Sequence, residues 1–375
     1  MKVGVPKEVK NHEYRVAITP AGVHELVRSG HEVYLQQDAG AGSVIPDEDF
    51  VAAGATILPS ADDVWQTGEL ILKVKEPVAE EYHRMRKDQV LFTYLHLAAD
   101  VELTNSLAAT GATCVAYETV EDKNGRLPLL APMSEVAGKI ATQAGAFMLE
   151  KPLGGRGILL GGVPGVAAAN VLVIGGGVVG MHAAHVAIGM GSTVTVFDRN
   201  LDRLRDLDVA FDGKADTLYA TTLAIEEKLH EADLVIGAVL VVGAKAPHVV
   251  TRAQLGLMKK QAVLVDVSID QGGCFETSRP TTHTNPTYEV DGITHYCVAN
   301  MPGAVPITST YALTNATMPY VIHLASLGVH KAIVENPGLR LGVNVAAGEV
   351  TYRPVAEAVG MQCVDVDTAL AAVPA

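Results

Sequence analysis

Short apolar runs alternate with longer amphipathic stretches along most of this 375-residue chain. The runs are rich in Val, Ile and Leu and carry few charges, which is typical of strands buried in a parallel sheet. In the first part of the chain we expect helices over 21–29 and 101–109, because each of these patterns ends at a glycine. We expect strands at 2–5, 32–36, 70–74, 90–95 and 113–117. Strands that alternate with helices in this way predict a doubly wound parallel α/β sheet.

A second series of strands and helices starts near residue 129. A helix is expected over 135–151 with Ser134 as its N-cap. Strands are expected at 171–174, 193–197, 233–240, 262–267 and 296–299. The composition changes near Met301-Pro302-Gly303-Ala304-Val305-Pro306, before a helix over about 314–334 and a weakly patterned tail.

The tail carries no nucleotide-binding motif, so we expect it to return to the first series. The predicted fold is therefore two doubly wound parallel-sheet domains. One is discontinuous, formed by 1–128 and 306–375, and the other is inserted over 129–305.

The run Gly175-Gly176-Gly177-Val178-Val179-Gly180 follows the apolar strand at 171–174 and opens a helix over 178–190. In this setting the first glycine permits the tight turn, the third lets the backbone approach a pyrophosphate, and Gly180 lets the helix pack close to the sheet. The free N–H groups at the start of the helix favour phosphate. The pattern predicts that the inserted domain is a Rossmann domain that binds a dinucleotide.

Asp198 ends the next predicted strand. A carboxylate there accepts hydrogen bonds from ribose hydroxyls and repels a 2′-phosphate, so we expect NAD as the cofactor. Arg199 is discordant, because an arginine beside the carboxylate can tolerate NADP.

The net charge of −14 argues against nucleic acid or an anionic membrane as a partner. Residues 157–197 contain no Asp, Glu, Lys or Arg, but Pro164 and many glycines divide this stretch into strand and helix patterns, so a buried nucleotide domain explains it better than a membrane span. The first six residues are too short and strand-like for a signal peptide. The four cysteines are far apart, which indicates reduced thiols in a cytosol, and we expect no catalytic metal.

Three polar residues follow predicted strands, where ligands bind in parallel sheets: Lys75, His96 and Asp270. Facing a nicotinamide, such groups could hold a carboxylate, polarise a carbonyl and move protons. Each also has a plainer explanation: Lys75 as a solvated charge, His96 as a satisfied polar group at a strand end, and Asp270 as a turn cap. Arg15 follows the first strand, and an ordinary surface arginine is the default interpretation.

Several motifs resemble one known family. Lys7-Glu8-Val9-Lys10-Asn11-His12-Glu13-Tyr14-Arg15-Val16-Ala17-Ile18-Thr19-Pro20 is similar to the opening of the alanine dehydrogenase and transhydrogenase α-subunit family. Leu72-Lys73-Val74-Lys75-Glu76-Pro77 and Thr93-Tyr94-Leu95-His96-Leu97-Ala98 resemble its alanine dehydrogenase branch. The same holds for 131–138, 266–273, 298–302 and 308–317, so the resemblance extends from residue 1 to about 340.

This resemblance implies reversible NAD-dependent oxidative deamination of L-alanine to pyruvate and ammonium by a cytoplasmic homohexamer. It assigns Arg15 and Lys75 to the substrate carboxylate and carbonyl in the discontinuous, catalytic domain, and His96 and Asp270 to acid–base steps. The expected NAD contacts are Ser134, Gly175, Gly177, Val178, Val179, Gly180, Asp198, Arg203, Val239, Leu240, Val267, Asp270, Arg279, Val298, Asn300 and Met301.

The chain departs from the family pattern at a few positions. Residue 203 is Arg where many relatives carry Lys, and it should still reach the adenosine side. Residue 220 is Ala where some carry Ser, so no hydroxyl contact is expected there. Glu118 is linked to a divalent ion in some relatives, but the region around Ser326 and Leu327 lacks the partner Asp, so no such ion is expected here.

Two other functions are compatible with the glycine motif. One is the soluble NAD(H)-binding subunit of a proton-translocating transhydrogenase, whose distinctive Arg/Gln/Asp-bearing loop is absent near 131–135. The other is a non-enzymatic NAD sensor, which would not need Lys75, His96 and Asp270 together at strand ends.

Overall fold

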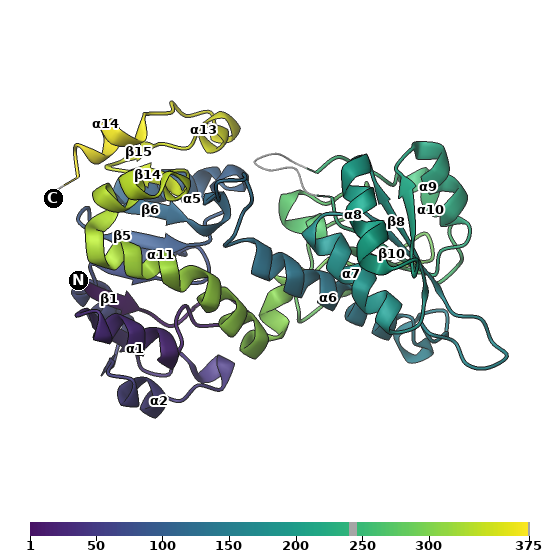
Figure 1. Ribbon diagram of the computed structural model, residues 1–375, viewed down its shortest axis with the longest axis horizontal. Coiled ribbons are helices and arrows are strands. Elements are labelled where there is room, and N and C mark those ends of the chain that lie inside the picture. Colours follow the sequence, from purple (N-terminus) through teal and green to yellow (C-terminus); the bar gives the residue numbers. More distant parts are fainter. Residues whose placement is uncertain (240–245, 374–375) are drawn as a thin grey trace. The chain divides into compact units, whose positions relative to one another are not determined.

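The computed structural model describes residues 1–239 and 246–373, which form two compact α/β units (Figure 1). Unit 1 comprises Met1–Met133 and Val305–Ala375, and unit 2, Ser134–Ala304, is inserted between these two parts. The predicted boundaries after residues 128 and 305 fall close to these bounds. The C-terminal tail belongs to the unit formed by the first part of the chain.

Unit 1 contains an eight-stranded sheet in the order β15-β14-β6-β5-β4-β1-β2-β3. Strands β1 to β6 run parallel, whereas β14 is antiparallel to both β6 and β15. The strands are β1 Lys2–Val5, β2 Glu32–Gln36, β3 Thr56–Leu58, β4 Leu70–Leu72, β5 Val90–Thr93, β6 Thr113–Ala116, β14 Val343–Ala346 and β15 Glu349–Val350.

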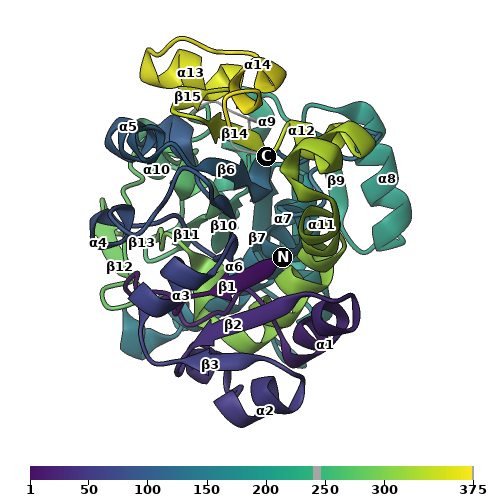
Figure 2. The same ribbon diagram turned by 90° about the vertical axis from the view of Figure 1, so that its left-hand side faces the viewer.

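Helices cover both faces of this sheet. Figure 2 shows α1 and α11 on one side, with α3, α4 and α5 on the other. The second face is apolar, because Trp65 of α3 and Leu107 of α5 pack with Leu91 and Cys114 of the sheet. The helices are α1 Pro20–Arg28, α2 Asp47–Ala52, α3 Ala61–Thr67, α4 Ala79–Tyr82, α5 Val101–Thr110, α11 Pro306–Glu335, α12 Pro337–Arg340, α13 Arg353–Val359 and α14 Val366–Leu370, with 3₁₀ turns η1 Ala41–Ser43, η2 Leu97–Ala99 and η3 Tyr117–Thr119.

Unit 2 contains a seven-stranded sheet in the order β12-β13-β11-β10-β7-β8-β9, parallel except for β12. Its strands are β7 Asn170–Ile174, β8 Thr193–Asp198, β9 Asp216–Tyr219, β10 Leu234–Gly237, β11 Val263–Asp266, β12 Thr287–Val290 and β13 Ile293–Tyr296. Its helices are α6 Ala131–Met148, which begins just before the unit boundary, α7 Val178–Gly189, α8 Leu201–Phe211, α9 Thr222–Leu229 and α10 Arg252–Leu255, with η4 Lys151–Leu153, η5 Val267–Gln271 and η6 Met301–Ala304. Within the described ranges, no helix combines the length and apolar character needed to cross a membrane.

Both sheets share one strand order. If the parallel strands of each unit are counted along the chain, both read 3-2-1-4-5-6, with β1 beside β4 in unit 1 and β7 beside β10 in unit 2. In a doubly wound sheet, ligands bind outside the carboxyl ends of the strands where this order reverses. We therefore expect ligand-binding residues in the segments that follow β1 and β4 in unit 1, and in those that follow β7 and β10 in unit 2.

The predicted fold class is confirmed, but several details of the prediction are wrong. The strands that precede Lys75 and His96 end earlier than expected, at Leu72 and Thr93, and the last parallel strand of unit 2 is β13, three residues before the expected range. Ser134 is not an N-cap, because α6 already begins at Ala131. The short strands β3, β9, β12, β14 and β15 were not expected, since their two to four residues carry little pattern.

The contact between α7 and the glycine turn before it allows no side chain at Gly180. A Cβ atom there would lie 1.8 Å from the carbonyl oxygen of Gly175. Gly189, at the other end of α7, has no neighbour within 4 Å of the same position. The two glycines of this helix therefore allow a matched test, since an added side chain would clash at Gly180 but not at Gly189.

Gly180→Ala should destabilise the protein by about 1–3 kcal/mol, because either the turn or the helix must move. Gly189→Ala should be neutral or stabilising by up to about 1 kcal/mol, since it removes backbone freedom from the unfolded chain without a clash. Urea unfolding of both variants measures the difference. Equal stability of the two would contradict the packing described here.

Candidate functional site

The glycine turn of unit 2 is shaped to receive an anion. Gly175 has φ 105°, a conformation that favours glycine, and its N–H donates to the carbonyl of Phe197 at 2.8 Å. Gly177 is the N-cap of α7, and nothing lies within 4 Å of where its Cβ would be. The first N–H groups of α7 have no carbonyl partner within the helix, so they can donate to phosphate. An open position at Gly177 beside these donors fits a dinucleotide pyrophosphate.

Asp198, the last residue of β8, contacts this turn directly. Its Oδ2 accepts a hydrogen bond from Gly176 N at 2.7 Å, and its Oδ1 accepts one from Asn200 N at 2.8 Å. Arg203 lies over the same turn, because its Nε donates to the carbonyl of Gly176 at 2.6 Å. Arg199, the neighbouring residue that could tolerate NADP, is exposed. A carboxylate at this place, with further lone pairs on both oxygens, can accept hydrogen bonds from a ribose diol.

The segments after β10 and β11 meet at the carboxyl edge of the same sheet. Ser268 Oγ donates to the carbonyl of Val239 at 2.7 Å, and Val267 begins the turn η5. Asp270 lies exposed in that turn. Leu240, also expected to touch NAD, lies outside the described residues.

Asp266 is a buried carboxylate that the sequence did not single out. It accepts hydrogen bonds from Ser268 N at 2.9 Å, Cys274 N at 2.8 Å and Ser278 Oγ at 2.5 Å. Burial raises the pKa of Asp266, although these donors act in the opposite direction. Asp266, rather than Asp270, therefore fixes the turn that leads into Gly272 and Gly273. The position of Asp266 at the end of an apolar strand was the signal in the sequence that could have indicated this role.

The remaining expected cofactor residues of unit 2 are spread along its sequence. Arg279 is exposed, and its guanidinium lies 4.2 Å from the ring centre of Tyr288. Val298 is buried and bridges to Thr281, Asn300 has a left-handed backbone with φ 66°, and Met301 is buried at the start of η6. Ser134 lies in the first turns of α6.

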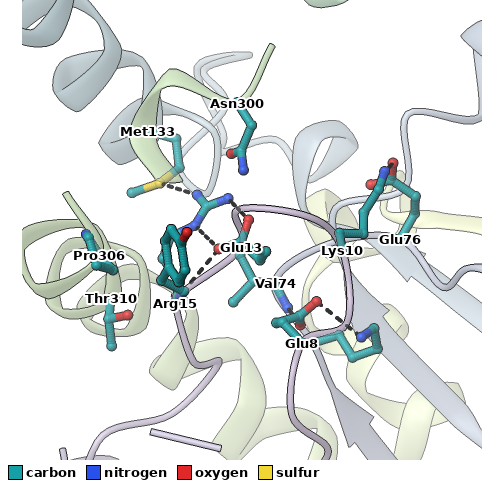
Figure 3. A network of polar contacts seen from close by, with 12 residues as sticks. Glu8, Lys10, Glu13, Arg15, Val74, Glu76, Met133, Asn300, Pro306 and Thr310 are labelled. Atoms are coloured by element: carbon teal, nitrogen blue, oxygen red, sulfur yellow. Dashed lines mark hydrogen bonds and ion pairs between the residues drawn. The ribbon is translucent and has the colours of Figure 1, made fainter. Parts of the chain in front are cut away.

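In unit 1, Arg15 is buried rather than on the surface, with 2 % of its area exposed. Its Nε and Nη2 donate to the two carboxylate oxygens of Glu13 at 2.7 and 2.5 Å, and its Nη1 lies 3.1 Å from the sulfur of Met133 (Figure 3). Burial opposes the charge, but Glu13 outweighs it and holds the pKa of Arg15 above its ordinary value. An anion that binds beside Arg15 would meet a guanidinium whose orientation Glu13 already fixes.

Lys75 and Glu76 follow β4 by a few residues and are half-buried. Lys10 pairs with Glu76, as Figure 3 shows. Burial acts to raise the pKa of Glu76, but Lys75, His96 and Lys10 together bring it below its usual value. Lys75 and His96 thus both favour the charged form of this carboxylate.

His96 has an unusual backbone conformation, with φ 52° and ψ 35°. The carboxylate of Glu118 holds it there, because it accepts from Leu95 N at 3.1 Å and from His96 N at 2.6 Å. The imidazole stacks on the ring of Tyr94 with centres 5.8 Å apart, and 34 % of the side chain is exposed. The backbone conformation of His96 thus fixes the direction of its side chain, and the imidazole is only partly covered by other residues.

A buried ion cluster beneath these residues was also missed. Lys73 has no exposed surface, and its Nζ lies 3.0 Å from Glu8 Oε2 and 3.0 Å from Glu81 Oε1. The alternating charges of Lys73-Val74-Lys75-Glu76 suggested a solvated segment, but Lys73 points into the unit.

The structure therefore collects the expected residues at two sheet edges. Arg15, Lys75 and His96 follow β1, β4 and β5 of unit 1, which are neighbours in its sheet. In unit 2, the glycine turn follows β7 and Asp198 ends β8. Val239 follows β10, and Asp270 follows β11. His96 and Asp270 thus belong to different units.

Comparison with known proteins gives matches over nearly the whole chain. Residues 4–137 match the family model described as "Alanine dehydrogenase/PNT, N-terminal domain", and residues 141–353 match "Alanine dehydrogenase/PNT, C-terminal domain". A protein of Halomonas elongata named alanine dehydrogenase is 58 % identical over 365 residues, which are 97 % of this chain and 98 % of that protein.

Solved structures give the same result. One described as L-alanine dehydrogenase aligns with a TM-score of 0.92 and 50 % identity, over 96 % of this chain and 99 % of that one. A transhydrogenase from Sinorhizobium meliloti aligns with a TM-score of 0.80 at 24 % identity, over 94 % of this chain and 99 % of that chain, and thus shares the fold.

Proposed function

Because this chain belongs to the alanine dehydrogenase/PNT family of oxidoreductases, we propose that it catalyses the reversible, NAD-dependent oxidative deamination of L-alanine to pyruvate and ammonium. One observation carries the proposal: cationic Arg15 and Lys75, with His96, follow neighbouring strands of unit 1 in a chain 58 % identical to a named alanine dehydrogenase. We also propose the cytoplasmic homohexamer that the resemblance in sequence implies, and sedimentation would test the hexamer.

NAD is proposed as the cofactor of unit 2. The N–H groups at the start of α7 would hold its pyrophosphate, and Asp198 its adenosine ribose. The nicotinamide, when bound, supplies the hydride acceptor. The other proposed contacts, from Ser134 to Met301, are those that the family resemblance implies.

Arg15 and Lys75 would bind the substrate carboxylate and carbonyl oxygen. Glu13 already occupies the Nε and Nη2 side of the guanidinium, whereas Nη1 faces the sulfur of Met133. A thioether is a weak acceptor, and a carboxylate binds a guanidinium N–H more strongly than a thioether does. Lys75 then orients the α-carbon and polarises the carbonyl.

His96 and Asp270 would move the protons. The α-ammonium of alanine loses a proton and its α-carbon loses a hydride, which leaves an iminium; water adds to it, and ammonium departs to give pyruvate. These steps need a base for the attacking water and an acid for the departing amine. His96, half-buried and fixed by its backbone, and Asp270, exposed in η5, are the proposed groups.

The direct test is NAD reduction over a panel of small L-amino acids, followed by NADH oxidation with pyruvate and ammonium. L-Alanine should be turned over, and acetaldehyde, which lacks the carboxylate, should not replace pyruvate. NAD binding without turnover of any amino acid would overturn the proposal. It would favour a transhydrogenase subunit or an NAD sensor, and added NADPH with a transhydrogenase partner would separate these two.

Asp198→Ala should narrow the preference for NAD over NADP by about 1–3 kcal/mol, as expected for loss of a charged hydrogen bond and of charge repulsion. It should also weaken NAD binding, since Oδ2 supports the N–H of Gly176. Kinetic constants for both cofactors measure the change. Asp202→Ala is the control, because that carboxylate is 88 % exposed on α8. Equal use of both cofactors by the wild type would contradict the argument.

His96→Ala and Asp270→Ala should each lower kcat by about 10²–10⁴-fold, the usual contribution of general acid–base groups. NADH binding, followed by fluorescence titration, should persist in both variants. His83→Ala removes an exposed histidine of the same unit and should leave kcat unchanged. Near-normal turnover in either test variant would return that residue to a structural role.

A further inference from the structure

The six-residue segment from Lys73 to Val78 carries Lys75 and is fixed along its length by carboxylates. Glu8 Oε1 accepts the N–H of Val74 at 2.6 Å, and Glu8 Oε2 accepts from Lys73 Nζ at 3.0 Å. At the far end, Glu81 Oε2 accepts the N–H of Val78 at 3.1 Å. Glu8 therefore holds the backbone of Val74, the residue before Lys75 (Figure 3). It also holds the side chain of Lys73.

Glu8 also belongs to the segment that bears Arg15. This segment follows β1, and β1 lies beside β4, at the point where the strand order reverses. A single buried carboxylate thus joins the two connections that carry the proposed substrate cations. Lys73 makes this arrangement feasible, since an unpaired carboxylate buried here would be strongly destabilising.

We propose that Glu8 is a positioning residue for the substrate site, and that it acts by setting the location of Lys75 relative to Arg15. The inference rests on the proposed function. It assigns a role in pyruvate and alanine binding to a residue that touches neither, because its two bonds end at Val74 and Lys73. A small substrate makes few contacts, so a displacement of Lys75 changes a large share of them.

The sharpest variant is Glu8→Gln, which keeps shape and size. Both partners of Glu8 are donors, the N–H of Val74 and the ammonium of Lys73, and each binds a different carboxylate oxygen, whereas an amide replaces one of these oxygens by an NH2 donor. Glutamine can therefore satisfy only one of the two, and the segment before Lys75 must shift. Glu8→Asp is the second variant: it keeps the charge but is shorter by one carbon–carbon bond of about 1.5 Å.

The matched control is Gln89→Leu. Gln89 is also buried in unit 1, and it donates two hydrogen bonds, to the carbonyls of Trp65 and Gly68. It precedes β5 and so lies at the amino edge of the sheet, opposite the candidate site. This variant should lower Tm as the Glu8 variants do, without reaching Lys75.

The measurements are KM for pyruvate in reductive amination, Kd for NADH by fluorescence, and Tm. Glu8→Gln and Glu8→Asp should raise KM for pyruvate about tenfold, which corresponds to about 1.4 kcal/mol. The Kd for NADH should change by less than about twofold, because that proposed site lies in unit 2. Gln89→Leu should leave KM for pyruvate unchanged.

An unchanged KM in both Glu8 variants would overturn the inference. An equal rise of KM in Gln89→Leu at similar Tm would do so too, since it would show a general effect of lost stability. Absence of wild-type turnover would instead overturn the proposed function itself, and the inference with it.

Discussion

The arrangement of both units follows from one constraint of parallel sheets: every strand ends at the same edge. Where the strand order reverses, the two connections leave that edge toward opposite faces, and the space between them cannot be filled by either. This place lies between β1 and β4 in unit 1 and between β7 and β10 in unit 2. The chemistry-bearing residues collect there because no other edge of the sheet offers an opening of this kind.

The two units use this place in different ways. Unit 2 presents backbone N–H groups from a glycine turn and the start of α7, with Asp198 as the main carboxylate at the turn. Unit 1 presents side-chain ions, and it buries three carboxylates, Glu8, Glu13 and Glu81, with the cations Lys73 and Arg15. Fixed dipoles receive an anion at little cost, whereas buried ions must be paired with one another before any ligand arrives.

The sequence predicted the fold class and the glycine turn because both depend on local patterns. Strands β1 and β2 were placed at their observed bounds, and Gly175, Gly177 and Gly180 sit where the motif requires. The positions of Lys75, His96 and Asp270 after predicted strands singled them out, and the resemblance to a known family then supplied Arg15, the roles of all four and the further NAD contacts.

What the sequence missed depends on contacts between distant residues. Lys73 and Lys75 look alike in Lys73-Val74-Lys75-Glu76, and only the positions of Glu8 and Glu81 determine that Lys73 is buried. Likewise, Ser134 resembles an N-cap until α6 is seen to begin earlier, and Asp270 resembles a turn cap although Asp266 makes the hydrogen bonds. The antiparallel strand β14 owes its conformation to pairing with β6, more than 200 residues away in sequence.

The backbone conformation of His96 implies a trade-off between the stability of the fold and the proposed proton transfer. Its left-handed conformation costs a residue with a Cβ atom about 1 kcal/mol or more relative to glycine, and the two N–H bonds to Glu118 offset that cost. If selection acted on stability alone, glycine or asparagine would be favoured at this position. Neither of these residues carries an imidazole, so variants chosen only for heat resistance would tend to lose the group proposed for proton transfer.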